Sequence, residues 1–399
     1  MTRPAVHEYA AAVRPRYRKA ARQEKRRILD EFCQTTGMHR KAAIRLLNQT
    51  AKPKPLPPGR PQSYLPETVA ALVRLWQVGD RMCGKLLGPV IPDLLRTLER
   101  FGEIQVPDQV REQLLRVSAA SIDRLLRPYK RPGLRQPLLK RPQATLLKSQ
   151  VPIRTWSEWS GVPPGSLQAD LVLHCGESLE GFYLTTLCAV DVATGWTALE
   201  PVWGLGQQRV GSAIHHVREH LPFAMKTLHT DNGSEFINHT LFAWCQREKI
   251  GFSRGRAYRK NDQAYVEQRN WLTVRRHVGY DRLASRQALA LLHKLYPLLT
   301  AQLNFFRPVR KLVHKERQGA KLIKHYDQPR TAYQRLLASG CLSDSAQDQL
   351  ERLLLRLNPA ELQRRIDSLL RQLWRLGQEE RKGGKRWVTV FMRHQAATR

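Results

Sequence analysis

Residues 167–270 alternate short apolar, strand-like runs with helical stretches, and this order constrains the fold more than any other feature of the sequence. Three strand-like runs come first, the last two joined by the turn Ala193-Thr194-Gly195. Strands that can meander, followed by alternating helices and strands, predict a mixed sheet with helices on both faces. The predicted elements are strands within 167–176 and 181–203, a helix at about 207–221, a strand at 225–230, a helix at about 238–249, a strand at 250–253 and a long helix from near Asp262.

The net charge of +33, from 67 Lys+Arg against 34 Asp+Glu, is distributed unevenly along the 399 residues. Residues 151–300 hold 16 Lys+Arg and 13 Asp+Glu, a net of +3, so the other 249 residues carry 51 minus 21, or +30. Such an excess of cations predicts attraction to a polyanion, for which nucleic acid is the usual candidate. The sequence therefore predicts a nearly neutral core that basic flanks deliver to nucleic acid.

The cysteines and the apolar runs exclude several classes of protein. The six cysteines are scattered and form no Cys-x-x-Cys pair, which argues against a zinc ribbon and against a disulfide framework. No apolar run reads as a signal peptide or reaches the length of a transmembrane helix. We therefore expect a cytoplasmic protein with no membrane partner.

Two basic helical regions precede the core. In residues 1–52, Thr36-Gly37 separates two helices, the second rich in Arg and Lys, which is the helix-turn-helix pattern; a generic helical hairpin with solvated basic faces is the alternative. Residues 65–130 predict a second helix-turn-helix, ending in a short helix that Ser118 or Ser121 can cap. The DNA-contacting residues predicted in these two domains are Arg40, Lys41, Arg45, Arg124 and Arg127.

Basic, proline-broken linkers are predicted at 53–64 and 131–155. In the first, Arg60 lies in a Gly-Arg-Pro tripeptide that can enter an A·T-rich minor groove, although a plain linker explains it equally simply. Residues 306–399 turn basic and irregular and then become helical, with a final strand predicted in the tail "KRWVTVFMR". A stripe in the last helix can form a coiled coil with another subunit or pack within the chain; its members are Leu362, Ile366, Leu369, Leu373 and Leu376.

Three acidic residues stand out in the central region. Asp170 interrupts the otherwise apolar strand "LQADLVLHCG", where an unpaired carboxylate is costly and needs a partner or a metal. Asp231 follows the strand "TLHT", and Glu267 falls about one turn inside the predicted helix near Asp262. Taken singly, each acid has an ordinary explanation. Asp170 can pair with a base such as Arg269, Asp231 can be a turn residue before Asn-Gly, and Glu267 can be an ordinary helix glutamate.

The set of three resembles the catalytic triad of DDE transposases and retroviral-type integrases. In that family the first acid is on the first strand, the second follows the fourth strand, and the Glu is on a helix about 35 residues later. Here 60 residues separate Asp170 from Asp231, and 35 separate Asp231 from Glu267. The string "RGRAYRKNDQAYVEQRNW…VGYDRL" further resembles one group of bacterial insertion-sequence transposases. No His-His-Cys-Cys zinc module occurs near the N-terminus, which departs from retroviral integrases proper.

The resemblance implies a multidomain protein: N-terminal all-α helix-turn-helix units, a central α/β ribonuclease-H-like core at 156–305, and a basic, helical C-terminal region. It also implies that Asp170, Asp231 and Glu267 are catalytic and hold two Mg²⁺ ions, for which Mn²⁺ can substitute. Phosphodiester chemistry suits such a set, because two Mg²⁺ ions can stabilise the attacking and leaving oxygens and bind hard oxygen ligands. Asp170 is expected to bridge both ions. The helix that carries Glu267 can change the direction of its carboxylate, so we expect this carboxylate to be correctly placed only when DNA is bound.

Residues around the triad are candidates for holding a DNA end. The basic loop before the Glu267 helix supplies several cations, and each has the alternative of a merely solvated surface charge. Asp191 is a possible turn cap, and Asp262 a possible helix cap or surface residue. The predicted DNA-contacting residues in this region are Asn232, Arg254, Arg256, Arg259, Lys260 and Arg269.

The function that the sequence favours is a DNA transposase that binds terminal inverted repeats as at least a dimer, then cuts and joins 3′ ends to target DNA. Two alternatives remain open at this stage. A ribonuclease-H-like nuclease without joining activity would share the core, but it would rarely need two helix-turn-helix units. A catalytically inactive DNA-binding regulator would keep the fold, but it would not need all three acids.

Overall fold

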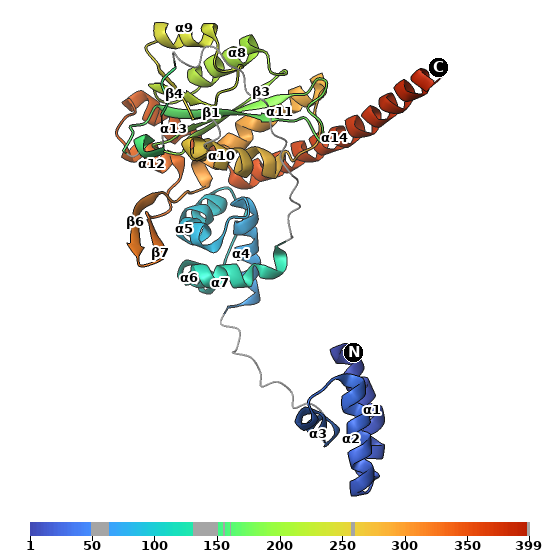
Figure 1. Cartoon of the computed structure of the whole chain (residues 1–399). Helices are drawn as coiled ribbons and strands as arrows, with labels where there is room; N and C mark the ends of the chain where they lie inside the picture. Colours follow the sequence, from blue (N-terminus) through green and yellow to red (C-terminus); the bar gives the residue numbers. More distant parts are fainter. Residues whose placement is uncertain (49–63, 131–150, 155, 160, 257–259, 397–399) are drawn as a thin grey trace. The chain divides into compact units, whose positions relative to one another are not determined.

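The computed structural model of the chain describes residues 1–48, 64–130, 151–154, 156–159, 161–256 and 260–396 (Figure 1). The chain divides into two compact units, Met1–Ser63 and Tyr64–Arg399. The predicted linkers at 53–64 and 131–155 fall largely outside the described residues. No helix in the described part of the chain is both long enough and apolar enough to cross a membrane.

The first unit contains α1 (Arg3–Lys19), α2 (Arg22–Thr36) and α3 (Arg40–Asn48). The predicted break at Thr36-Gly37 is confirmed: Gly37 ends α2 with a φ of 69°, a left-handed conformation that favours glycine. The three helices share a small core of their own. Its buried members are Ala10, Tyr17, Ile28, Leu29, Phe32, Ala43, Leu46 and Leu47.

The second unit begins with four helices, α4 (Pro66–Val78), α5 (Gly84–Arg100), α6 (Asp108–Arg116) and α7 (Ala119–Leu125). The predicted cap is confirmed at Ser118, whose hydroxyl accepts the Ser121 backbone N–H (3.2 Å). Helices α5 and α7 approach so closely that a Cβ at Gly84 would lie 2.1 Å from the Ala119 carbonyl oxygen. Only glycine fits at the start of α5.

A five-stranded mixed sheet forms the centre of the second unit, as the sequence predicted. The strands lie in the order β3-β2-β1-β4-β5. β3, β2 and β1 pair antiparallel, β4 pairs parallel with β1, and β5 pairs parallel with β4, which is the ribonuclease-H-like topology. The strands are β1 (Ser166–Leu173), β2 (Thr185–Asp191), β3 (Thr197–Val202), β4 (Thr227–Thr230) and β5 (Gly251–Arg254).

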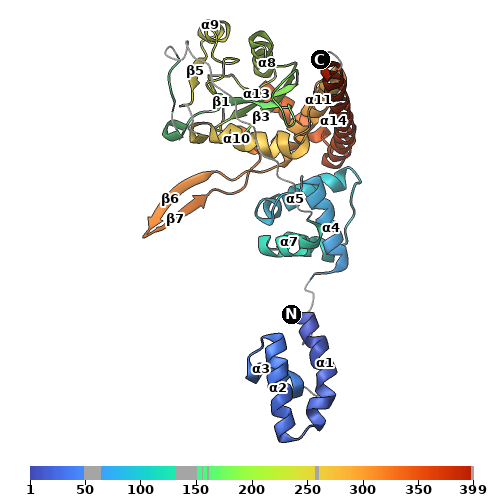
Figure 2. The same cartoon turned by 45° about the vertical axis from the view of Figure 1, so that its right-hand side comes forward.

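Helices cover the sheet. Helices α8 and α9 lie on one side of it and α10 on the other (Figures 1 and 2). The helix that carries Glu267 continues from α10 into a π-helical segment, η5, where one extra residue per turn rotates the side chains that follow. The elements are α8 (Gln207–Glu219), α9 (His239–Arg247), η4 (Lys260–Gln263), α10 (Ala264–Arg269), η5 (Asn270–Arg275), α11 (Arg286–Ala301) and η6 (Gln302–Phe306).

The C-terminal region differs from the prediction in two places. An antiparallel hairpin, β6 (Leu312–Gln318) and β7 (Lys321–Tyr326), replaces part of the predicted irregular segment; almost all of its side chains are exposed, so it lacks the apolar face that marks a strand. The predicted final strand is wrong, because helix α14 (Pro359–Ala396) runs through the tail. Helix propagation from an established helix outweighs the weak strand preference of a few β-branched residues.

The leucine stripe of α14 packs within the chain. Helix α14 lies against α11, and Leu362, Ile366, Leu370 and Leu373 are buried, whereas Leu369 and Leu376 are half-buried. This contact uses the face that a coiled coil with another subunit would need. Two shorter helices precede α14, namely α12 (Ala332–Ala338) and α13 (Asp344–Arg356).

Candidate active site

Two of the three predicted acids lie at the same level of adjacent parallel strands. β1 and β4 pair in a register that runs from Ser166–Thr227 to Gln168–His229. Continuing this register by two residues brings Asp170 level with Asp231, which directly follows the last residue of β4. Asp170 lies within β1, three residues before its end, and both acidic residues are half-buried.

Asp231 also shapes the turn that follows β4. Its Oδ1 accepts the backbone N–H of Gly233 at 2.9 Å, the short-range bond by which aspartate commonly starts a turn. The turn role and a role in a cluster of acids are therefore compatible, because the turn bond fixes the carboxylate at the strand end beside Asp170.

Glu267 comes from α10, which packs against β1 and β2. The start of this helix is held by Gln168, which is fully buried on the same face of β1 as Asp170. Its Nε2 donates to the Asp262 carbonyl oxygen (3.1 Å), and its Oε1 accepts the Val266 N–H (3.3 Å). Sequence reasoning missed Gln168, although a second polar residue two positions from Asp170 in an apolar strand was the available signal.

Asn270 connects the Glu267 helix directly to Asp170. Its Nδ2 donates to Asp170 Oδ2 at 2.7 Å, while the Leu171 N–H donates to Asp170 Oδ1 at 2.8 Å. Asn270 follows Glu267 by three positions and so lies on the same side of the helix. Both oxygens of Asp170 are therefore oriented, and Asn270 is a second positioning residue that sequence reasoning did not identify.

Burial and the two neighbouring acids make Asp170 harder to ionise. Burial, followed by the negative charge of Asp231 and then of Glu267, raises the pKa of Asp170 from 3.8 to about 7, although the bonds from Leu171 and Asn270 act in the opposite direction. A carboxylate with this environment is costly to ionise at neutral pH. A divalent cation between the acids would remove that cost.

The donor set fits Mg²⁺ in its chemistry, because it consists of carboxylate oxygens with no histidine or thiol among them. In the part of the chain that the structure describes, no three His, Cys, Asp or Glu side chains lie close enough together to form a ready-made metal site. Glu267 is exposed, and the π-helical segment η5 begins three residues after it. That the carboxylate of Glu267 reaches its final position only with DNA bound stays a prediction.

The raised pKa of Asp170 predicts a specific pH dependence of stability. Because the pKa in the folded chain exceeds the ordinary value of 3.8, ionisation destabilises the fold; this cost is absent below pH 3.8, grows up to pH 7 and is complete above it. Asp170→Asn is expected to stabilise the metal-free chain at pH 8 by roughly 1–4 kcal/mol, since each pKa unit corresponds to about 1.4 kcal/mol. The gain should fade toward pH 4 in thermal unfolding.

Added Mg²⁺ should stabilise the wild type at pH 8 but not the Asp170→Asn variant, because only the wild type offers the full site. Asp348→Asn, on the exposed face of α13, serves as the matched control and should follow the wild type throughout. A gain that did not change with pH, or equal stabilisation of all three proteins by Mg²⁺, would contradict this account of Asp170.

Asn232 and Arg254, both predicted to contact DNA, bond to each other. Arg254 Nη1 donates to Asn232 Oδ1 (2.9 Å), and Asn232 Nδ2 donates to the Gly255 carbonyl oxygen (2.8 Å). Asn232 is buried and Arg254 half-buried, and the Arg254 Nε also donates to the Val151 carbonyl oxygen (3.1 Å). In this structure the pair holds the turn after Asp231 onto β5.

Arg256 is exposed but forms a bidentate ion pair with Asp262. Its Nε donates to Asp262 Oδ2 (2.8 Å), and its Nη2 donates to Asp262 Oδ1 (2.9 Å). Asp262 is fully buried, so the expectation of a helix cap or surface residue at this position is wrong; Gln263 precedes α10 instead. Asp191 is a turn cap, as expected: it accepts the Thr194 N–H (2.8 Å) and its hydroxyl.

Arg269 is buried, and its Nη2 donates to the Gly195 carbonyl oxygen (3.2 Å). Burial and the nearby Arg307 lower the pKa of its guanidinium to about 10. The side chain therefore presents no exposed surface to DNA in this structure. Arg60 and Arg259 lie outside the described residues, as does the side chain of Lys260.

The cations predicted in the two N-terminal helical regions are on the surface. Arg40 pairs with Asp30 of α2, and Arg124 donates to the Ser121 hydroxyl (3.2 Å). All five are exposed, as contacts with phosphate would require. They are Arg40, Lys41 and Arg45 in α3, Arg124 in α7 and Arg127 just after it.

Comparison with known proteins gives one clear relative. The uncharacterized protein y4rM of Sinorhizobium fredii is 41% identical over 325 residues, which is 81% of this chain and 92% of that protein. The chain belongs to the y4rM family. No protein-family model matches the chain.

Among solved structures, the catalytic core domain of BIV integrase aligns with this y4rM-family chain at 19% identity. The alignment covers 44% of this chain and 95% of that domain, with a TM-score of 0.28. The fold assignment rests on the strand order and directions rather than on this likeness.

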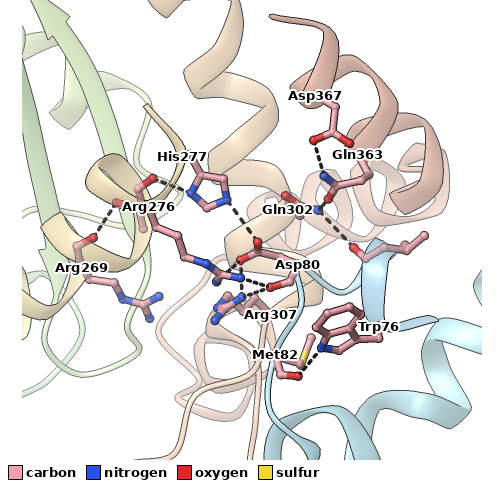
Figure 3. Close-up of polar contacts among 12 residues, drawn as sticks. Trp76, Asp80, Met82, Arg269, Arg276, His277, Gln302, Arg307, Gln363 and Asp367 are labelled. Atoms are coloured by element: carbon pink, nitrogen blue, oxygen red, sulfur yellow. Dashed lines mark hydrogen bonds and ion pairs between the residues drawn. The ribbon is translucent and has the colours of Figure 1, made fainter. Parts of the chain in front are cut away.

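In this member of the y4rM family, a buried charge cluster joins the helices of residues 64–130 to the helix that carries Glu267 (Figure 3). Asp80 is the centre of the cluster and has a φ of 57° in the loop after α4. Its carboxylate accepts from Arg276 Nη1 (3.0 Å) and His277 Nε2 (3.2 Å) and also pairs with Arg307.

The Asp80 backbone takes part as well, because its carbonyl oxygen accepts from Arg276 Nη2 (2.8 Å) and Arg307 Nη1 (2.9 Å). Burial alone would raise the pKa of the Asp80 carboxyl, but His277, Arg307 and Arg276 together lower it below its ordinary value. Nearby, Gln302 Nε2 donates to the Val78 carbonyl oxygen (3.2 Å). Asp80 thus anchors the downstream end of the Glu267 helix to the preceding helical domain.

Proposed function

We propose that this protein is a DNA transposase that binds the terminal inverted repeats of a mobile element and catalyses Mg²⁺-dependent cleavage and joining of DNA 3′ ends. The observation that carries the proposal is the placement of Asp170, Asp231 and Glu267. Asp231 follows the last residue of β4, and Asp170 lies level with it in the adjacent parallel strand β1 of a ribonuclease-H-like sheet. Burial, followed by the charges of Asp231 and Glu267, raises the pKa of Asp170.

Asp170, Asp231 and Glu267 would hold Mg²⁺, with Mn²⁺ as a substitute. When bound there, the metal supplies charge stabilisation at the oxygens around phosphorus during an in-line displacement. The chain's own contribution is positioning: Asn270 orients Asp170, and Gln168 sets the start of the Glu267 helix. Both positioning residues act through bonds already present in the chain without DNA.

The charge distribution supports delivery of this core to DNA. The residues outside 151–300 carry a net +30, and two helical domains with exposed cations precede the sheet. Phosphate contacts from such surfaces supply affinity without reading sequence, whereas helices that enter the major groove read base edges. Recognition of the element's ends is assigned to these domains.

The test is incubation of the full chain and Mg²⁺ with a duplex that carries the element's terminal repeat and a supercoiled target plasmid. Covalently joined products support a transposase. Cleavage of RNA–DNA hybrids or junctions without joined products identifies a nuclease instead. Sequence-specific binding with neither reaction identifies an inactive regulator.

The active assembly is expected to contain at least two copies of the chain, because transposition joins two element ends to one target. Light scattering or native mass measurement on terminal-repeat DNA should give at least twice the 46.0 kDa mass of the chain plus two duplexes. The same measurement on a duplex of scrambled sequence is the control. A complex that stayed at one chain and one duplex while joining activity was present would contradict the prediction.

A further inference from the structure

The β6–β7 hairpin has two chemically different faces. Directly paired residues share a face of the hairpin. The pairs Lys315–Lys324 and Arg317–Leu322 therefore lie on one face, and the pairs Glu316–Ile323 and Gln318–Lys321 lie on the other. The first face carries three cations and no acid. The second carries Glu316, which pairs with His325 (3.5 Å).

The face with three cations borders a cleft of about 1080 Å³ between the hairpin, α10 and the start of α5. Among the residues that the structure describes, no Asp or Glu lines this cleft. Tyr265 and Gln268 of α10 are among the residues that line its wall, whereas Glu267 is not. The exposed cations that line it are Lys85, Arg310, Lys315 and Lys324.

The base of the hairpin is fixed while its strands project away from the sheet (Figure 2). Lys311 N–H donates to Asp327 Oδ1 (2.7 Å), and Arg335 of α12 pairs with the same carboxylate (2.7 Å). The Lys311 ammonium also donates to the Val192 carbonyl oxygen (2.5 Å) in the turn between β2 and β3. The base of the hairpin, which we call the arm, is thus anchored to the rest of the second unit.

Little within the chain covers the arm itself. Val313, Leu322 and Tyr326 on its cationic face are 70%, 51% and 44% exposed. An isolated two-stranded hairpin in water is only marginally stable, so an arm of this kind gains order from what it binds.

We propose that the cationic face of β6–β7, together with the cleft beside α10, is a binding site for duplex DNA. Charge complementarity selects a polyanion, and a two-stranded ribbon has the dimensions that the DNA major groove admits. The site deepens the proposed function, on which it rests: it adds a duplex-binding surface beside α10, formed by the hairpin and the start of α5.

The test compares two charge-matched triple variants of the full chain for binding a fluorescent 30-base-pair duplex of random sequence. Lys315→Gln/Arg317→Gln/Lys324→Gln removes the cationic face, while Arg352→Gln/Arg356→Gln/Arg371→Gln removes three exposed arginines from α13 and α14. Each phosphate contact contributes about 0.9 to the slope of log affinity against log salt concentration. The hairpin variant should therefore lose about 2–3 from the slope and bind roughly 10- to 100-fold more weakly near 0.1 M salt.

A second measurement separates the two faces. Leu322→Cys and Ile323→Cys are neighbouring positions on opposite faces, and each can carry a photo-crosslinker. Crosslinks to the duplex are expected from position 322 and should be several-fold weaker from position 323. Equal crosslinking from both would place DNA on no particular face and overturn the assignment.

The outcomes distinguish this site from the proposed function. If the wild type binds duplex DNA and the two triple variants are indistinguishable, the arm is not a DNA site, while the transposase proposal stands. If the wild type binds neither random nor terminal-repeat duplex, both proposals fail. Preference of the cationic face for an RNA duplex over the DNA duplex would overturn the choice of DNA as its ligand.

Discussion

Asp170→Asn is expected to lower the rate of Mg²⁺-dependent strand joining by at least about 1000-fold, with Asp231→Asn and Glu267→Gln giving losses of the same order. Each change keeps the shape of the side chain but removes a negative oxygen ligand. A metal contributes several kcal/mol of charge stabilisation in the transition state, and each 1.36 kcal/mol corresponds to a factor of ten in rate. The measurement is single-turnover joining of a pre-cleaved terminal-repeat end.

Binding of the same duplex should change by less than about threefold, because most affinity for DNA comes from cations outside the triad. Asp348→Asn and Glu351→Gln, two exposed acids of α13, are the matched controls and should join ends at the wild-type rate. A triad variant that joined ends within tenfold of wild type would remove that residue from the catalytic set.

Asp80→Ala is expected to destabilise the second unit by about 3–5 kcal/mol, the usual cost of removing one member of a buried ion pair. Without the carboxylate, Arg276, His277 and Arg307 would face one another in a buried site with no counter-charge. Alanine also fits poorly at the φ of 57° found at this position, whereas asparagine tolerates it. Chemical denaturation of the full chain measures the loss.

Asp93→Ala is the control for this change, because Asp93 is an exposed acid on α5 whose carboxylate pairs with Arg96 one turn away (3.3 Å). It should alter the unfolding free energy by less than about 0.5 kcal/mol. Asp80→Asn keeps the backbone conformation and loses only the charge, so it should fall between the two. If Asp80→Ala unfolded within about 1 kcal/mol of wild type, the cluster would not be the anchor described.

Sequence reasoning predicted the strand and helix order because apolar periodicity in residues 166–270 reports burial directly. It also selected Asp170, Asp231 and Glu267, since a carboxylate inside an apolar strand and two others at family spacing are visible without coordinates. The placement of Asp170 beside Asp231 follows from parallel pairing of β1 and β4. Their catalytic role remains the prediction that the variants above test.

Other parts depend on tertiary contacts that no local pattern encodes. Asn270 and Asp80 reach their partners across 100 and 196 residues, so their roles could not be predicted from spacing. Arg269 looked like a surface cation on a helix, but the chain buries it against Gly195. The side chains of the β6–β7 hairpin are exposed on both faces, so its sequence lacks the alternation of apolar and polar residues by which strands are predicted.

The Asp80 cluster also determines how this protein can be engineered. Residues 1–63 form a compact unit with a hydrophobic core of its own. This unit can therefore be exchanged for another DNA-binding domain without exposing the core of the second unit. Residues 64–130 cannot be exchanged in the same way, because the Asp80 carboxylate pairs with Arg276, His277 and Arg307 of the catalytic domain. A chimera that replaces them must carry an acid at this position or redesign all three partners.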